Sequence, residues 1–109
     1  MIEKIRTYLG FSLRAGKVIF GVDDIETYKK KIHLLLVDDG LGENSKKKIY
    51  KANEQLKAPL YIVEAGLLGN LLHREQVKAI GVKDFSLAQA IIKAAENQPQ
   101  FKSNSGGNN

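Results

Sequence analysis

The sequence predicts an α/β fold in which helices cover the faces of a sheet. Four short apolar runs, each bounded by turn residues, have the length and composition of buried strands. Stretches with helical spacing of apolar residues separate successive runs, which is the order expected of a layered α/β domain. The chain has 109 residues, 43% hydrophobic and 27% charged, so we expect a single folded domain over residues 1–97.

The first predicted elements are a helix, a strand and a second, short helix. The helix runs from about Ile2 to Ala15, because apolar residues recur on one face and a glycine follows as a stop signal. Val18–Phe20 is a β-branched and aromatic run bracketed by glycines, which favours a strand. Asp23 and Asp24 then suit a helix N-terminus, and Lys29–Lys31 suit its C-terminus.

A central strand is predicted at Leu34–Val37, because an unbroken apolar run is typical of a strand covered on both faces. Asn44 or Ser45 can cap the helix that follows. Its inward positions are Ile49, Ala52 and Leu56, and lysines crowd its opening turns at Lys46, Lys47, Lys48 and Lys51. Pro59 closes the loop before a third strand, Leu60–Val63.

The remaining elements are a short helix over Leu67–His73, a fourth strand at Ala79–Val82 and a last helix capped by Asp84. That last helix carries one apolar stripe, Leu87, Ala88, Ile91, Ile92 and Ala95. Residues 98–109 have almost no core-forming side chains, and we expect a disordered polar tail there.

Composition excludes several classes of function. There are no cysteines, which rules out disulfides, thiolate metal sites and cysteine nucleophiles. No run of apolar residues is long enough for a signal peptide or a membrane span, so we expect a cytoplasmic protein. With 17 Lys and Arg against 12 Asp and Glu, the net charge of +5 favours a polyanionic partner.

No catalytic or cofactor motif is complete, so we expect neither an enzyme nor a cofactor. His33 and His73 have no metal-ligand spacing, and no glycine-rich phosphate loop is finished around Gly40 and Lys46. One enzyme-like pattern stays open. Asp38 and Asp39 follow the central strand, where paired carboxylates could serve a metal-dependent receiver or phosphohydrolase. The alternative is that one of them caps the turn before the glycine.

Four separate stretches resemble one family of RNA-binding proteins. They are Tyr8–Gly21, Asp39–Lys48 (especially Glu43–Lys48), Leu68–Leu72 and Ala79–Phe85, in the same order as in the family. The family is the kink-turn RNA-binding ribosomal proteins of the L-seven-Ae and L-thirty-e type, in the bacterial YlxQ-like branch. The resemblance covers about residues 2–95. It implies a three-layer α/β/α sandwich around a mixed four-stranded sheet, as in ribosomal protein L-thirty-e.

The resemblance also implies a non-enzymatic function in binding structured, kink-turn-like RNA, with ribosomal RNA or the ribosome as partner and neither DNA nor a membrane. Bent RNA with extruded bases is read by shape, because the deep major groove hides the base edges. The loop and helix that follow the first strand would meet backbone and purine edges, and a later loop would close over a flipped-out nucleotide. The RNA-binding residues carried over or placed beside them are Lys17, Gly21, Val22, Asp23, Asp24, Thr27, Lys30, Arg74, Glu75, Gln76 and Val77.

The chain departs from the family pattern at several of these positions. Asp23-Asp24 stands where Asn-Glu is usual, Thr27 where a lysine is usual, and His73 where a glycine is expected. An ionised carboxylate only accepts hydrogen bonds and repels phosphate, whereas an amide also donates. The second helix also looks about one turn short. These departures favour an alternative, a protein-interaction module on the same fold whose RNA-binding edge has decayed.

Overall fold

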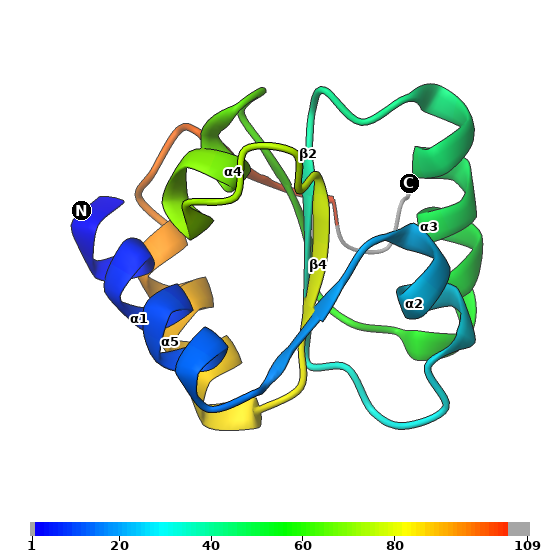
Figure 1. Cartoon of the computed structure of the whole chain (residues 1–109), viewed down its shortest axis with the longest axis horizontal. Coiled ribbons are helices and arrows are strands. Elements are labelled where there is room, and N and C mark those ends of the chain that lie inside the picture. Colours follow the sequence, from blue (N-terminus) through cyan, green and yellow to red (C-terminus); the bar gives the residue numbers. More distant parts are fainter. Residues whose placement is uncertain (1, 105–109) are drawn as a thin grey trace.

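The computed structural model describes residues 2–104, and they form a five-stranded mixed sheet with helices on both faces. Figure 1 shows three layers, with α1, α4 and α5 on one side of the sheet and α2 and α3 on the other. The helices are α1 Ile2–Arg14, α2 Val22–Thr27, α3 Glu43–Leu56, α4 Leu67–Leu72 and α5 Phe85–Ala95. The strands are β1 Val18–Phe20, β2 Leu34–Asp38, β3 Leu60–Val63, β4 Ala79–Val82 and β5 Phe101–Ser103.

The strands lie in the order β1-β4-β2-β3-β5, so β2 is central as predicted. Strand β4 runs antiparallel to both β1 and β2, whereas β2 and β3 are parallel. All five residues of β2 are buried, because helices cover both of its faces and strands flank both of its edges. The carboxyl ends of β1, β2 and β3 therefore meet the start of β4 at one end of the sheet.

Two apolar clusters hold the layers together, one on each face of the sheet. On one face, Ile5, Leu9 and Ile91 are fully buried against β2 and β4. On the other face, Ile25 of α2 and Ile49 of α3 are fully buried. Burying each such side chain contributes about 1.5 to 3 kcal/mol. The amphipathic faces predicted for the long helices are thus the ones that pack.

The prediction of four strands is wrong, because a fifth strand lies in the segment predicted to be a disordered tail. Strand β5 pairs antiparallel with β3, aligning Phe101 with Val63 and Ser103 with Tyr61. The Phe101 side chain is only 5% exposed. One aromatic side chain and a free edge on β3 are enough to order this segment through residue 104; residues 105–109 of the predicted tail lie outside the described part.

The helix ends predicted from capping and charged residues agree with the structure at some positions and differ at others. The Asp84 carboxylate caps α5 by accepting a hydrogen bond from the Leu87 N–H at 2.8 Å, as predicted. Helix α3 instead begins at Glu43, after Gly42, so the caps predicted at Asn44 and Ser45 are wrong. Lys29–Lys31 lie beyond the end of α2, in the loop before β2. Within residues 2–104, the helices are too short or too polar to cross a bilayer.

Candidate nucleic-acid interface

The junction between β1 and α2 is fixed beside the first residue of β4. Gly21 ends the strand with φ 88°, a left-handed conformation that favours glycine because side chains with a Cβ rarely adopt it. Its N–H donates to the Ala79 carbonyl at 2.9 Å. The predicted RNA-binding residues Gly21 and Val22 therefore sit where the chain enters β4.

The loop between α4 and β4 is packed tightly against α4. The Arg74 N–H donates to the Gly69 carbonyl at 2.9 Å, and the Val77 N–H donates to the Arg74 carbonyl at 3.0 Å. A Cβ placed on Gly69 would lie 2.8 Å from the Glu75 carbonyl oxygen and 2.9 Å from that of Arg74. The absence of a side chain at Gly69 is thus what allows the loop its position.

These two segments, more than fifty residues apart in sequence, meet around one open pocket of about 300 Å³. The lining residues are Phe20, Gly21, Val22, Leu41, Gln76, Val77, Lys78 and Ala79. The Arg74 guanidinium lies over the Phe20 ring, 4.7 Å from its centroid, as a cation–π contact. The structure therefore brings together five of the predicted residues, Gly21, Val22, Arg74, Gln76 and Val77.

Phe20, Leu41 and Lys78 also line this pocket and were not among the predicted site residues. Phe20 directly precedes Gly21, and Lys78 directly follows Val77, so adjacency to the predicted segments was a usable signal for both. Nothing local marks Leu41, because it arrives from the loop after β2.

Lys17 and Lys30 lie at the other end of the sheet from this pocket. The Lys17 carbonyl accepts from the Lys83 N–H at 2.8 Å, beyond the last residue of β4, whereas Gly21 pairs with the first. Lys30 belongs to the loop before β2, where the His33 N–H donates to the Val82 carbonyl at 2.8 Å. The length of β1 therefore separates Lys17 from Gly21, and neither Lys17 nor Lys30 lines the pocket.

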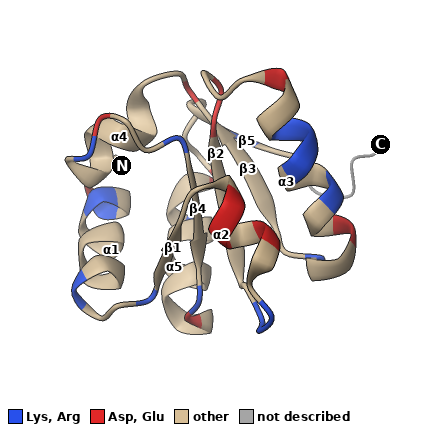
Figure 2. Cartoon of the chain, turned by 45° about the vertical axis from the view of Figure 1, so that its right-hand side comes forward, with Lys and Arg blue, Asp and Glu red and all other residues tan. Residues whose placement is uncertain are grey.

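Helix α2, which begins at the lining residue Val22, carries acidic side chains that are not themselves part of the pocket lining. Asp23, Asp24 and Glu26 are exposed, and Figure 2 shows the red of acidic residues on this helix. The hydroxyl of Thr27 donates to the Asp23 carbonyl at 3.1 Å, so it is used within the helix. Glu75, on the facing loop, is also exposed. The predicted residues Asp23, Asp24, Thr27 and Glu75 thus add carboxylates and no cation.

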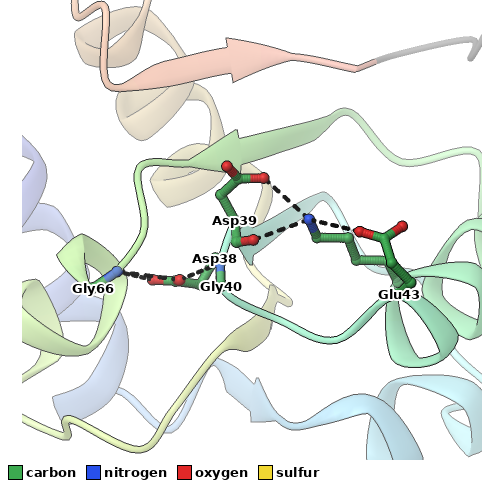
Figure 3. A network of polar contacts seen from close by, with 6 residues as sticks. Asp38, Asp39, Gly40, Glu43 and Gly66 are labelled. Atoms are coloured by element: carbon green, nitrogen blue, oxygen red, sulfur yellow. Dashed lines mark hydrogen bonds and ion pairs between the residues drawn. The ribbon is translucent and has the colours of Figure 1, made fainter.

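A polar network behind the pocket joins the loops after β2 and β3 (Figure 3). The Asp38 carboxylate is 1% exposed and accepts hydrogen bonds from the Gly40 N–H at 2.8 Å and the Gly66 N–H at 3.0 Å. The prediction that one of the paired aspartates caps the turn before Gly40 is confirmed for Asp38. Its oxygens are engaged by backbone amides, so a metal-dependent role would require displacing them.

Lys46 forms the second half of this network, although the sequence places it in a run of solvated lysines. Its ammonium donates to the Asp39 carbonyl and carboxylate, both at 3.0 Å, and lies 3.7 Å from the Glu43 carboxylate. The hydrogen bond to Asp39 raises the pKa of Lys46 above its usual value, outweighing the desolvation that would lower it. The charge of Lys46 is therefore used inside the protein.

Comparison with known proteins adds the fold alone. No protein-family model matches the sequence, and no curated protein gives a significant match. Solved structures do match, among them a protein of unknown function from Bacillus halodurans, with a TM-score of 0.74 and 22% identity. That alignment covers 83% of this chain and 94% of the other, so the two share an architecture over nearly the whole domain.

Proposed function

We propose that this chain is a non-enzymatic RNA-binding protein that recognises structured, kink-turn-like RNA through the pocket between the β1–α2 junction and the α4–β4 loop. The observation that supports this most is the meeting of Gly21 and Val22 with Gln76 and Val77 around one pocket. Both segments belong to the RNA-facing elements that the family resemblance implies. The finer fold assignment, a sandwich like that of ribosomal protein L-thirty-e, is part of the same proposal.

The chemistry of the pocket suits an extruded base. Its walls combine apolar side chains with a backbone glycine, and Arg74 brings a guanidinium plane to the rim above Phe20. Unstacked RNA bases are bound by stacking on aromatic rings or guanidinium planes and by hydrogen bonds to their edges. Lys78, also on the lining, is available to meet a phosphate. Ribosomal RNA in the cytoplasm is the proposed partner.

A pair of matched RNAs tests this function. The protein is titrated at low salt against a kink-turn RNA and against the same RNA with its kink replaced by continuous pairing, and binding is followed by gel shift. We expect at least tenfold preference for the kinked form. Equal affinity for the two RNAs, or no binding to either, would refute the proposal.

A substitution at the rim of the pocket tests whether kink-turn RNA binds there. Arg74→Ala removes the guanidinium at the rim, and we expect it to weaken kink-turn binding by about tenfold. The matched control is Lys93→Ala, which removes one exposed charge from the last turn of α5. An equal loss in both variants would indicate a general charge effect and count against this pocket.

The exposed acids on α2 favour a second candidate function, a protein-interaction module with a decayed RNA edge. Asp23, Asp24 and Glu26 present three carboxylates on the helix that should face phosphate. The tagged protein would be captured from cell extract with and without ribonuclease. Recovery of one specific protein after ribonuclease treatment supports this candidate, and loss of all partners with the RNA refutes it.

A further inference from the structure

A second charged surface lies at the opposite end of the sheet from the proposed pocket. We call it the basic end, and it consists of Lys17, Lys29, Lys30, Lys31 and Lys83. Backbone hydrogen bonds fix its position, because the Lys83 N–H donates to the Lys17 carbonyl and the loop carrying Lys29–Lys31 leads to His33 beside Val82. In Figure 2 this loop is the blue segment at the bottom of the view.

The charges of the basic end are not neutralised within the described part of the chain. The ion pairs formed by residues 2–104 involve Arg6 and Lys46 as cations and none of the basic-end lysines. Lys17 and Lys29–Lys31 are exposed. The nearby carboxylate of Asp84 is engaged as the cap of α5, which leaves Glu26 as the acid adjoining the groove described below. Four of these lysines are thus exposed to solvent at this end of the sheet, and Lys83 is half-buried beside them.

Aromatic side chains are interleaved with these lysines. The Lys83 ammonium lies 5.8 Å from the centroid of the Tyr28 ring. Phe85, the first residue of α5, is 60% exposed, and its ring contacts the His33 ring edge-on with centroids 5.5 Å apart. A phenylalanine this exposed contributes little to the core, and most of its surface is open to solvent beside these lysines.

A groove of about 660 Å³ continues the basic end toward the C-terminus of α3. Tyr28, Lys29, Lys30 and Lys31 line one side, and Leu56 and Lys57 line the other. A phosphodiester chain laid in this groove would meet cations on both walls. A positively charged groove that tracks a backbone, combined with aromatic rings for the bases, is the usual arrangement for single-stranded nucleic acid.

We infer that the basic end binds the phosphate backbone of a single-stranded RNA segment, with one base stacked on Phe85. This goes beyond the proposed function, because it concerns a different end of the molecule and an unpaired strand instead of a kinked duplex. It also assigns a role to Lys17 and Lys30, which the structure separates from the pocket. One RNA could engage both ends, its structured part at the pocket and its flanking strand at the basic end.

The test uses the full chain and a fluorescent twelve-nucleotide oligouridylate, followed by anisotropy across a salt series. The triple variant Lys29→Gln, Lys30→Gln and Lys31→Gln should weaken binding at least tenfold and reduce the slope of log K against log salt by about 2, since each contact to a single strand contributes about 0.7. Phe85→Ala should weaken binding about fivefold or more with little change in slope.

The matched control is Lys47→Gln, Lys48→Gln and Lys51→Gln, which removes three exposed charges from α3. The inference would be overturned if the Lys29–Lys31 variant kept its oligouridylate affinity and its salt slope within twofold of the unmodified protein. It would also be overturned if the control variant lost as much affinity and slope as the Lys29–Lys31 variant. Competition by polyglutamate as effective as that by unlabelled oligouridylate would also overturn it, because any polyanion would then suffice. Kink-turn preference in the first triple variant reports separately on the pocket.

Discussion

The two ends of the sheet use their charged residues in opposite ways. At the pocket end, Lys46 is held by Asp39 and Glu43, and the Asp38 carboxylate is held by the amides of Gly40 and Gly66. At the basic end, lysines stand exposed without ion pairs within residues 2–104. Charge serves structure at the first end, whereas at the second it is exposed to solvent.

This difference shows why net charge is a weak guide to where a polyanion binds. The excess of +5 is a property of the whole chain, yet the pocket proposed for structured RNA is lined by Val22, which two exposed acids, Asp23 and Asp24, directly follow. Its case rests on shape, on Arg74 over Phe20 and on the convergence of two loops. The basic end offers a different combination, a larger groove lined by several lysines.

The largest expected effect tests whether charge at the pocket end is structural. Asp38→Ala leaves the Gly40 and Gly66 N–H groups without their acceptor and should lower the free energy of unfolding by about 2 to 3 kcal/mol, measured by urea denaturation. The triple Lys29–Lys31 to Gln variant should stay within about 0.5 kcal/mol of the unmodified protein. Similar losses in both would remove the contrast between the two ends.

The next effect tests the close packing that shapes the pocket. Gly69→Ala places a methyl group within 3 Å of the Arg74 and Glu75 backbone, so it should cost about 1 to 3 kcal/mol and displace the loop. Kink-turn affinity should fall while oligouridylate affinity at the basic end is unchanged. Gly10→Ala in α1 is the control, since its Cβ would meet only the end of the Arg14 side chain at 3.6 Å. Unchanged stability and kink-turn binding in Gly69→Ala would contradict the role of this packing.

A smaller effect on RNA affinity is expected when negative charge on α2 is replaced by positive charge. The double variant Asp23→Asn and Thr27→Lys removes a carboxylate and adds a cation, giving α2 the residue types usual in the family that the sequence resembles. We expect kink-turn RNA to bind about tenfold more tightly, with a steeper salt dependence. Gel shift over a salt series measures both quantities. Weaker or unchanged binding would mean that α2 does not face the RNA.

The smallest expected effect is the pH-dependent contribution of the Lys46 ion pair to the stability of the fold. Because the folded protein raises the pKa of Lys46, the pair stabilises the fold fully below the usual lysine value of 10.5 and loses its contribution as pH rises through the folded value. Lys46→Met should therefore lower the urea midpoint slightly at pH 7, and the difference should shrink above pH 10.5. A difference that stays constant across this pH range would show that the side chain acts by packing alone.

The strands and helices with strong local signals could be predicted from the sequence. The apolar run Leu34–Val37 identified a strand covered on both faces, and Asp84 identified the start of α5. Strand β5 could not be predicted, because three residues with one aromatic form a strand only when the β3 edge is there to pair with them. The burial of Lys46 was hidden for the same reason, since Asp39 reaches it from another loop.

The two segments that form the candidate site could be predicted from the sequence, but the full set of residues that line the pocket could not. The resemblance pointed to Gly21–Thr27 and Arg74–Val77, and the structure brings their adjoining ends together. It places Lys17 and Lys30 elsewhere, because a strand carries its two ends to opposite sides of the domain. Leu41 joins the pocket from a third segment that no local pattern connects to the other two.

The sequence by itself determined the α/β class, the central strand, the amphipathic helix faces and the absence of cysteine chemistry, because each depends on residue types at short spacing. Only the tertiary structure decided which charges are neutralised and which remain exposed. Ion pairs and packing join residues that are distant along the chain, so their partners depend on the order and direction of the strands. That is why one net charge of +5 divides into Lys46, held in ion pairs at one end of the sheet, and exposed lysines at the other that form no ion pair within residues 2–104.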